Sequence, residues 1–203
     1  MEERRITKGN QERMNNRENA GTNTPCVVCL GFFDGVHLGH QKLLETAREA
    51  AREKGLRICV HTFDHAPGPK RFELTTLEER ETLLREAGAD QVAVSVFDDE
   101  MRHMSGEEFF QKIVVGRLNA RHVVCGDDHR FGHKGACGIE ELAALCREAQ
   151  VGLSVVPPVT LPGGERISSS SIRMALVQGN DELVEKMLGR PADEKMKMRA
   201  RNA

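Results

Sequence analysis

The sequence predicts an α/β domain in which a parallel, five-stranded sheet carries helices on both faces. Short, almost entirely apolar runs alternate with amphipathic runs of helical period between residues 26 and 189. Runs without a polar face are typical of parallel strands that are buried from both sides. A parallel pair also needs a crossover connection, and the amphipathic runs between the apolar ones supply helices of suitable length.

The first strand is predicted at residues 26–32, where the letters CVVCLGF are almost all apolar. Residues 38–55 follow as a helix, because Leu and Ala recur at helical spacing along one face. Gly55 ends that helix, since glycine readily adopts the left-handed backbone found at helix C-termini. Residues 56–63, LRICVHTF, form the next apolar run and are predicted as the second strand.

Capping signals mark the start of the next two helices. Thr76 and Ser105 each stand three residues before a Glu, so side chain and backbone can bond reciprocally in the first helical turn. An apolar run follows each of these helices and is read as a strand. The elements predicted in this stretch are a helix at 75–88, a strand at 91–97, a helix at 105–119 and a strand at 121–126.

The last strand and three further helices complete the pattern. Residues 138–150 form an amphipathic helix, and the apolar run 152–157 is the fifth strand. A turn at Pro162-Gly163-Gly164 precedes two short helices at 171–179 and 181–189. In a sheet of this kind ligands collect beyond the carboxyl ends of the strands, so the loops there are the place to look for chemistry.

Length and charge limit the class of partner. The chain has 203 residues, enough for one α/β domain, and 29 Lys and Arg against 31 Asp and Glu give a net charge of −2. That balance offers no general attraction for a nucleic acid. The apolar runs are far shorter than the ~18 residues that span a bilayer, and the polar N-terminus lacks the apolar core of a secretory signal. We therefore expect a cytoplasmic protein without nucleic-acid or membrane partners.

The chain divides into three predicted segments. Residues 1–24 are polar and lack periodicity, which predicts a disordered extension. Residues 25–191 hold the alternating elements and form the domain. Residues 192–203 end in the basic letters KMKMRARNA and are predicted to be a frayed, solvated tail.

Four of the six cysteines lie in the predicted strands. Cys26 and Cys29 have the spacing of a redox or zinc pair, but no second ligand pair follows at the spacing that a zinc site needs. Free cysteine is among the most buried residue types, so buried thiols are the favoured interpretation. No protein metal ligand is therefore predicted.

The loop after the first strand has the features of a phosphate site. It reads from Gly31 to His40 and leads into a helix whose first N–H groups are unpaired and whose dipole is positive. His37 and His40 are three residues apart, so both imidazoles can face the same ligand. Gly39 between them carries no side chain and lets a phosphate approach the backbone closely. A capped helix with surface histidines is the simpler alternative.

Two further loops carry candidate ligand groups. Residues 166–173, RISSSSIR, place hydroxyls and N–H groups at a helix start between two arginines, which is a suitable nest for an anion. Residues 126–135, GDDHRFGHKG, follow the fourth strand and mix carboxylates, cations and an aromatic ring between glycines. This mixture favours an ordered ligand loop over a cation site, with a mobile polar loop as the alternative.

Together these three segments resemble the FAD synthetase (FMN adenylyltransferase) module of the bacterial bifunctional riboflavin kinase/FAD synthetases. That module belongs to the nucleotidylyltransferase superfamily, which has a His-x-Gly-His signature and a Rossmann-like fold. The resemblance covers residues 26–191. It rests on GFFDGVHLGHQ, GDDHRFG and RISSSSIR, with support from LTTLEER (74–80), SGEEFF (105–110) and MLGRP (187–191).

The resemblance implies transfer of AMP from ATP to FMN, giving FAD and pyrophosphate by in-line displacement without a covalent intermediate. The substrates would be ATP and FMN, with Mg²⁺ bridging phosphate oxygens, and the protein would be a monomer or weak homo-oligomer. The implied catalytic residues are His37, His40 and Arg173. The implied ATP-binding residues are Gly31, Phe32, Phe33, Asp34, Gly39, Arg166, Ser169 and Ser170. The implied flavin or nucleotide loop residues are Phe63, Asp128, Arg130 and Phe131.

The chain departs from the family pattern in two places. The family usually has Thr-Phe-x-Pro-His-Pro after the second strand, whereas residues 62–67 here read TFDHAP. The family also usually continues into a riboflavin kinase barrel, whereas this chain ends about 12 residues after Pro191, so we expect an adenylyltransferase that uses FMN made elsewhere. Two alternatives stay open: an adenylyl- or cytidylyltransferase for another phosphorylated acceptor, and a flavin- or nucleotide-binding paralogue, or cysteine-based sensor, without catalysis.

Overall fold

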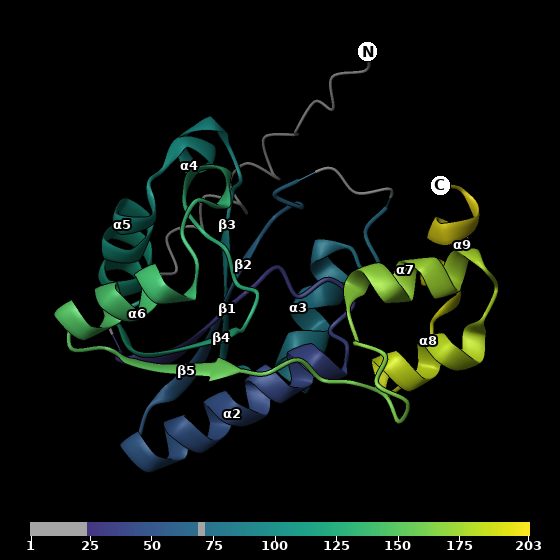
Figure 1. The fold of residues 1–203 in the computed structure, drawn as a ribbon, viewed down its shortest axis with the longest axis horizontal. Helices are drawn as coiled ribbons and strands as arrows, with labels where there is room; N and C mark the ends of the chain where they lie inside the picture. The colour runs from purple at the N-terminus through teal and green to yellow at the C-terminus, as the bar shows by residue number, and fades with distance from the viewer. Residues whose placement is uncertain (1–23, 69–71) are drawn as a thin grey trace.

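The computed structural model describes residues 24–68 and 72–203, and Figure 1 shows the arrangement of their elements. The predicted disordered extension lies outside the described residues apart from Thr24. The strands are β1 (Cys26–Leu30), β2 (Arg57–Phe63), β3 (Gln91–Ser95), β4 (Ala120–Gly126) and β5 (Gly152–Val156). The helices before β5 are α2 (Leu38–Lys54), α3 (Leu77–Glu86), α4 (Asp99–His103), α5 (Gly106–Glu108), η1 (Phe109–Arg117), η2 (His133–Gly135) and α6 (Ile139–Glu148). The helices after β5 are α7 (Ser169–Val177), α8 (Asp181–Leu188) and α9 (Glu194–Arg201).

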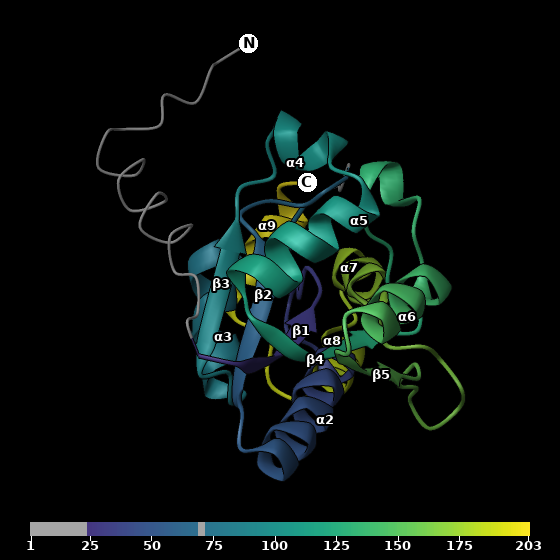
Figure 2. The same cartoon turned by 90° about the vertical axis from the view of Figure 1, so that its left-hand side faces the viewer.

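In the described residues the strands form one five-stranded sheet in the order β3-β2-β1-β4-β5 (Figure 2). Every adjacent pair is parallel, with Val28 of β1 opposite Cys59 of β2 and Val123 of β4. The predicted α/β fold is confirmed. The chain leaves β1 toward one edge, through β2 and β3, and then returns across the sheet to β4 on the other side of β1. The gap between the loops after β1 and β4 is therefore the point where a ligand is expected.

Helices cover both faces of the sheet, as predicted. One core cluster joins α2 and α3 to one face, and its largest fully buried members include Phe33, Leu44 and Leu84. The other cluster joins η1 and α6 to the opposite face through Phe110 and Leu142. The strand thiols lie in these two clusters, and all six cysteines are free.

Most local signals in the sequence have the predicted outcome. Thr76 and Ser105 form complete capping boxes, and Gly55 ends α2 in the left-handed conformation. The helix predicted at 105–119 is present, but after its first turn it continues as a π-helix, in which the Leu118 N–H donates to the Ile113 carbonyl. The sequence did not predict α4, a short helix capped by Asp98.

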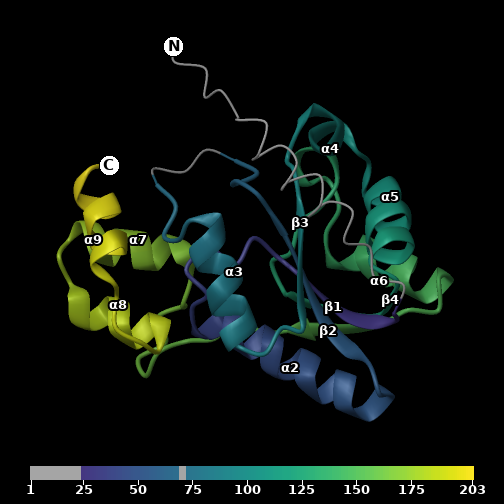
Figure 3. The same cartoon turned by 180° about the vertical axis from the view of Figure 1, so that it is seen from behind.

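The C-terminal residues contradict the prediction of a frayed tail. Residues 194–201 form α9, whose cap is Asp193 and whose Met196 and Ala200 are buried. These apolar side chains join those of α7 and α8 in a third core cluster. Figures 1 and 3 show α7, α8 and α9 together beside α3, at one end of the molecule. Lys195 and Arg201 of the tail are exposed, whereas Lys197 pairs with Asp181 and Arg199 pairs with Glu79 of α3, so the basic residues help to hold the helix in place.

None of the helices in the described part of the chain combines the length and the apolar composition that crossing a membrane requires.

Candidate functional site

A polar cavity and an apolar cavity lie side by side where the loops after β1 and β4 separate. The polar cavity, of about 390 Å³, is formed by the loop after β1, the first turn of α2, the loop after β4 and the start of α7. The apolar cavity, of about 580 Å³, is formed by the ends of β1 and β2, by α4 and η1, and by residues 129–135. The two share a wall made by Leu30, Gly31, Phe32, His129 and Arg130.

His37 and His40 line the polar cavity at the start of α2, as the sequence predicted. Their rings stack with centroids 3.6 Å apart. His37 caps the helix, because its Nδ1 accepts a hydrogen bond from the His40 backbone N–H at 3.4 Å. Burial lowers the pKa of His37 to about 4, with the positive charges of Arg190 and Arg173 acting in the same direction. His37 is therefore neutral near pH 7, and with Nδ1 accepting, its proton is on Nε2.

Gly39 lies between the two histidines and lines the same cavity. A Cβ there would come within 3.1 Å of the His37 ring, so a side chain would press on the imidazole. The turn that leads into α2 is strained, because Phe33 and Val36 have φ values of 59° and 41°. Such angles are uncommon for bulky or β-branched residues and cluster at functional sites. Arg190 holds this turn by donating to the carbonyls of Gly35 and Val36 at 2.7 and 3.1 Å.

Phe33 and Asp34, predicted to contact ATP, do not line the polar cavity, because their side chains are buried in the structure behind it. Asp34 is 1% exposed and accepts a hydrogen bond from the Thr75 backbone N–H at 3.1 Å. Its other oxygen pairs with Nη1 of Arg173 at 2.7 Å. Asp34 therefore positions Arg173, and we no longer expect it to contact a ligand directly.

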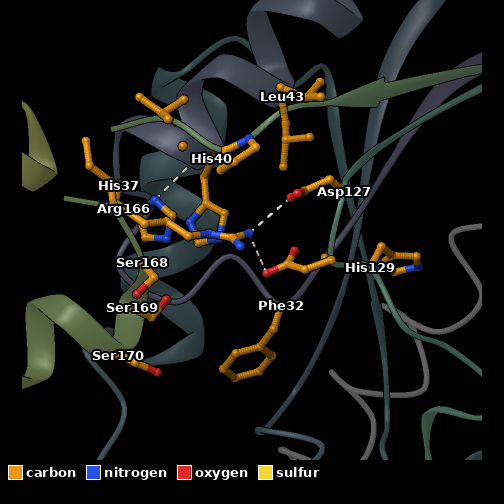
Figure 4. A pocket seen from close by; sticks show the side chains of 18 of the residues that line it. Phe32, His37, His40, Leu43, Asp127, His129, Arg166, Ser168, Ser169 and Ser170 are labelled. Carbon is orange, nitrogen blue, oxygen red and sulfur yellow. Dashed lines mark hydrogen bonds and ion pairs between the residues drawn. The ribbon is translucent and has the colours of Figure 1, made fainter. Parts of the chain in front are cut away.

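The start of α7 forms the opposite wall of the polar cavity (Figure 4). Ser168 caps the helix by accepting from the Ser171 N–H at 3.1 Å, so Ser169 and Ser170 lie in the first turn. The Ser169 hydroxyl donates to the Asp34 backbone carbonyl at 2.9 Å, which ties α7 to the loop after β1. The structure thus brings the histidine loop and the serine run to one cavity, although 168 − 40 = 128 positions separate His40 from Ser168 in the chain.

Arg166 reaches across the polar cavity between α7 and the loop after β4 (Figure 4). Its Nη2 lies 3.1 Å from Asp127 and 2.8 Å from Asp128, and all three side chains are substantially exposed. Because an exposed ion pair of this kind contributes little free energy, a bound anion can replace the carboxylates as the partner of Arg166.

Aromatic side chains dominate the apolar cavity. Of the residues implied for the flavin or nucleotide loop, Phe63 and Phe131 line this cavity, whereas Asp128 lines the polar cavity. Arg130 lines both, but its guanidinium donates to the carbonyls of Gly135 and Ala136 and so braces its own loop. Further lining side chains that the sequence did not single out are Phe97, Met101, Met104, Phe109 and Lys134.

Sequence reasoning missed two histidines that line the apolar cavity, the buried His61 and the partly buried His129. His61 is 1% exposed, and burial lowers its pKa to about 3. Burial also lowers the pKa of His129 to about 4, and its ring stacks parallel to that of Phe131. A histidine inside the apolar run of residues 56–63 was the available signal for His61, because a polar residue in a strand buried on both faces needs a partner.

Arg80, which the sequence did not single out either, supports the shared wall of the two cavities. Its side chain is fully buried, and its guanidinium lies 4.1 Å from the centroid of the Phe32 ring. It also donates to the Phe63 carbonyl at 2.6 Å. Arg80 therefore links the residue between the cavities to the end of β2.

The described residues contain no group of three or more His, Cys, Asp or Glu placed to hold a metal ion. The carboxylates nearest the polar cavity, Asp127 and Asp128, are paired with Arg166. This part of the chain therefore offers no protein cage for a cation.

Comparison with known proteins relates most of the chain to one family. Residues 19–171 match the family described as FAD synthetase. The bifunctional riboflavin kinase/FMN adenylyltransferase of Bacillus subtilis (strain 168) is 35% identical over 173 residues, covering 81% of this chain and 54% of that protein. The protein of the same name from Escherichia coli (strain K12) is 34% identical over 177 residues, covering 82% and 55%. The chain thus spans about half the length of these curated relatives.

Two solved structures resemble this chain in fold. A Streptococcus pneumoniae structure described as a macrolide-efflux protein superposes with a TM-score of 0.76 at 32% identity, covering 85% of this chain and 67% of that one. A pantoate-beta-alanine ligase from Francisella tularensis, complexed with an ATP analogue and beta-alanine, gives a TM-score of 0.52 at 12% identity, covering 83% and 74%. At that identity the likeness concerns the fold alone.

Proposed function

Because the chain belongs to the FAD synthetase family, we propose that it transfers the adenylyl group of ATP to FMN, giving FAD and pyrophosphate. The observation that carries the proposal is the pair of adjoining cavities at the β1/β4 switch point. One is lined by helix N-termini, imidazoles, hydroxyls and arginines, and the other by aromatic rings. A phosphorylated ring compound and a nucleoside triphosphate could therefore meet at the shared wall.

The polar cavity suits the phosphates of ATP. The first turns of α2 and α7 both face it, so unpaired N–H groups and two helix dipoles favour an anion there. Ser169, Ser170 and Arg173 would hold the β- and γ-phosphates, with Arg166 exchanging its carboxylate partners for phosphate oxygens. Asp34 keeps the Arg173 guanidinium in a fixed orientation, so little reorganisation is needed when ATP binds.

The reaction needs positioning more than proton transfer. A phosphate monoester has a second pKa of about 6, so the FMN phosphate is mostly a dianion at neutral pH and needs no general base. One of its oxygens forms a bond to the α-phosphorus of ATP. The bond from that phosphorus to the oxygen bridging to the β-phosphorus breaks, and its electron pair leaves with pyrophosphate. In-line geometry and neutralisation of charge then account for the rate.

His37 and His40 would stabilise the charge that develops during this displacement. His37 is a neutral imidazole with its proton on Nε2, so it would donate a hydrogen bond to a phosphate oxygen without carrying a full charge. A neutral donor of this kind stays available over a wide range of pH. Its fixed orientation, through the His40 N–H, is what electrostatic preorganisation requires.

The apolar cavity suits the flavin ring of FMN. Phe63 and Phe131 offer faces and edges to a flat ring, and Phe32 stands on the wall toward the polar cavity. Residues 64–67, where the chain departs from the usual family sequence, contribute Pro67 to the lining, so the altered loop still borders this cavity.

Mg²⁺ is proposed as part of the substrate, entering as Mg-ATP. The described residues provide no protein cage, and the ion commonly keeps several waters and binds substrate phosphates instead. No step in the scheme is assigned to it.

We further propose a cytoplasmic enzyme, monomeric or weakly self-associating, whose partners are its small-molecule substrates. The free thiols of the described residues suit a reducing compartment. The net charge of −2 gives no general attraction for nucleic acid.

The test is to incubate the purified protein with Mg-ATP and FMN and to measure FAD by chromatography and pyrophosphate by a coupled assay. The proposal predicts one FAD for each pyrophosphate released. Parallel reactions with phosphopantetheine and glycerol phosphate test the other acceptors. Turnover with one of these and none with FMN, or binding of FMN and ATP without turnover, would contradict the proposal.

A further inference from the structure

A chain of buried polar groups runs beneath the apolar cavity. Arg117, at the end of η1, donates from Nη2 to the Ser95 hydroxyl at 2.9 Å. The same hydroxyl lies 2.9 Å from Nε2 of His61 on the neighbouring strand. Ser95 and His61 are each 1% exposed, and Arg117 is partly buried, so the bond between Ser95 and His61 is out of contact with bulk water.

The direction of these hydrogen bonds follows from the donors available. A guanidinium can only donate, so Ser95 accepts from Arg117 and keeps its own hydroxyl proton. Among the described residues the one acceptor that this hydroxyl meets is Nε2 of His61. A donating Ser95 makes Nε2 the acceptor, and the proton of the neutral imidazole is then on Nδ1. Burial, the charge of Arg117 and the nearby His129 all disfavour a second proton and lower the pKa of His61.

The His61 ring is fixed at the floor of the cavity. The edges of Phe63 and Phe109 pack against it, with centroids 5.1 and 5.5 Å away. The imidazole lines the cavity, whereas Ser95 lies below it and does not. No residue of the described chain supplies a hydrogen-bond partner for Nδ1. Nδ1 of His61 is not among the buried side-chain atoms that lack a partner, so it is accessible from the cavity that His61 lines. A fixed N–H donor at the floor of a largely apolar cavity points to a ligand that provides the acceptor.

We infer that His61, oriented by Ser95 and Arg117, is a specificity-determining residue that donates one hydrogen bond from Nδ1 to the ring of the acceptor substrate. The ligand class is a flat heteroaromatic ring with a carbonyl oxygen at its polar edge. This inference rests on the proposed function, in which the oxidised flavin ring of FMN occupies the apolar cavity. His61 would select rings with such an edge over purely hydrocarbon rings of the same shape.

The chain contains a matched control for this arrangement. Nε2 of His122 lies 2.8 Å from the Ser154 hydroxyl, so β4 and β5 carry a histidine–serine pair like the one between β2 and β3. His122 lines neither cavity. Removing either imidazole breaks the same kind of cross-strand bond, but only His61 can touch a ligand in the apolar cavity.

The experiment compares His61→Leu, His61→Asn and His122→Leu with the unaltered protein. Asparagine places an amide N–H close to the position of the histidine Nδ1. Two quantities are measured: the Kd of FMN from its fluorescence, and the carbonyl stretching frequencies of bound FMN by infrared difference spectroscopy. The Kd of ATP and thermal unfolding are recorded for each variant.

For His61→Leu we expect the Kd of FMN to rise about tenfold, since a buried hydrogen bond is lost, while the Kd of ATP stays unchanged. The carbonyl frequency should also rise, because the donor is gone. His61→Asn should restore part of both, and His122→Leu should change neither. If His61→Leu fails to fold, the carbonyl frequency and the Kd of FMN measured in His61→Asn decide the outcome. Values equal to those of the unaltered protein support a donor retained by the asparagine. A raised Kd of FMN with an unshifted carbonyl frequency overturns the inference.

Equal FMN affinity and equal carbonyl frequency in His61→Leu and the unaltered protein would overturn the inference and leave the proposed function standing. Failure of the unaltered protein to bind FMN would overturn both together. The two failures are therefore distinguishable in one set of titrations.

Discussion

The polar and apolar cavities share a wall but are built in opposite ways. The polar cavity is assembled from loop and helix-start residues far apart in the chain, such as His37, Ser169 and Arg173. The apolar cavity is built from strand ends and aromatic side chains, including Phe63 and Phe109. Both nevertheless contain a buried neutral imidazole with one nitrogen already bonded inside the protein, His37 in the first and His61 in the second. Burial keeps each ring neutral, and the internal partner decides which nitrogen is offered to a ligand.

In each cavity the imidazole donor is fixed in direction without carrying a full charge. In the polar cavity the surrounding arginines supply charge, and the neutral imidazole adds orientation. In the apolar cavity the hydrogen bonds from Arg117 and Ser95 orient His61, and Phe63 and Phe109 pack against its ring. A substitution in one cavity should therefore alter mainly the binding of the substrate that occupies that cavity.

The largest effect is expected for His40→Ala. Loss of one donor to the transition state typically lowers the rate on the order of 100-fold. The hydroxyls and arginines at the start of α7 remain in the variant, so much of the affinity for ATP should be retained. The kcat for FAD formation and the equilibrium Kd values of ATP and FMN are the measurements. FMN affinity should be unchanged, because His40 lines the polar cavity alone. An unchanged kcat would rule out the role of His40.

Asp34→Asn should weaken the ion pair with Arg173 that lies behind the polar cavity. The substitution removes the charge from the pair with Arg173, and a hydrogen bond between charged groups contributes about 2 kcal/mol. Urea denaturation should show a loss of that size, together with a raised Kd for ATP. Asp181→Asn, which breaks the partly exposed pair with Lys197, is the control and should cost well under 1 kcal/mol. Equal losses in the two variants would mean that Asp34 has no special positioning role.

Acidification should destabilise the fold through the buried imidazoles of both cavities. The folded-state pKa values of His37 and His61 are about 4 and about 3, below the value of about 6.5 in an unfolded chain. Between pH 6.5 and pH 4 the unfolded state binds more protons, so the free energy of unfolding falls as the pH falls. Each histidine contributes up to about 1.4 kcal/mol per pH unit.

Urea denaturation at several pH values between 6.5 and 5 measures this slope in the unaltered protein and in His61→Leu. The variant, with one buried histidine fewer, should show a smaller slope. Identical slopes would show that His61 is protonated in the folded state as easily as in the unfolded one.

The smallest effect is expected for Arg166→Met. Arg166 is about half exposed and already paired with Asp127 and Asp128. Replacing these carboxylates by a phosphate of ATP should therefore gain little free energy, and the Kd of ATP in the variant should rise only about fivefold. FMN affinity should be unchanged. Arg147→Met, on the exposed side of α6, is the control for a general change in charge. An equal effect in both variants would mean that Arg166 attracts ATP only through the net charge.

The sequence predicted the parts of this account that depend on local patterns. The alternating runs predicted the parallel sheet, and Thr76 and Ser105 predicted helix starts, because capping acts within four residues. The sequence singled out His37, His40 and the serine run as candidate anion-binding groups because each lies at a helix start. That they meet at one cavity depends on the position of α7, which no local pattern determines.

The parts that could not be predicted depend on contacts between distant residues. Phe33 and Asp34 lie in the same loop as His37, and only the packing of Thr75 and Arg173 around Asp34 makes them buried supports. The link from Arg117 to His61 joins three separate elements and leaves no spacing pattern. The α9 helix has a basic composition, and its packing became evident only with the partner surfaces of α7 and α8.

A crystal structure with FMN and a non-hydrolysable ATP analogue would locate both substrates at once. We predict the triphosphate between the first turns of α2 and α7, the flavin ring in the apolar cavity, and the FMN phosphate near the α-phosphorus at the shared wall. A flavin ring bound outside the apolar cavity, or a triphosphate that contacts neither His40 nor the start of α7, would contradict this prediction.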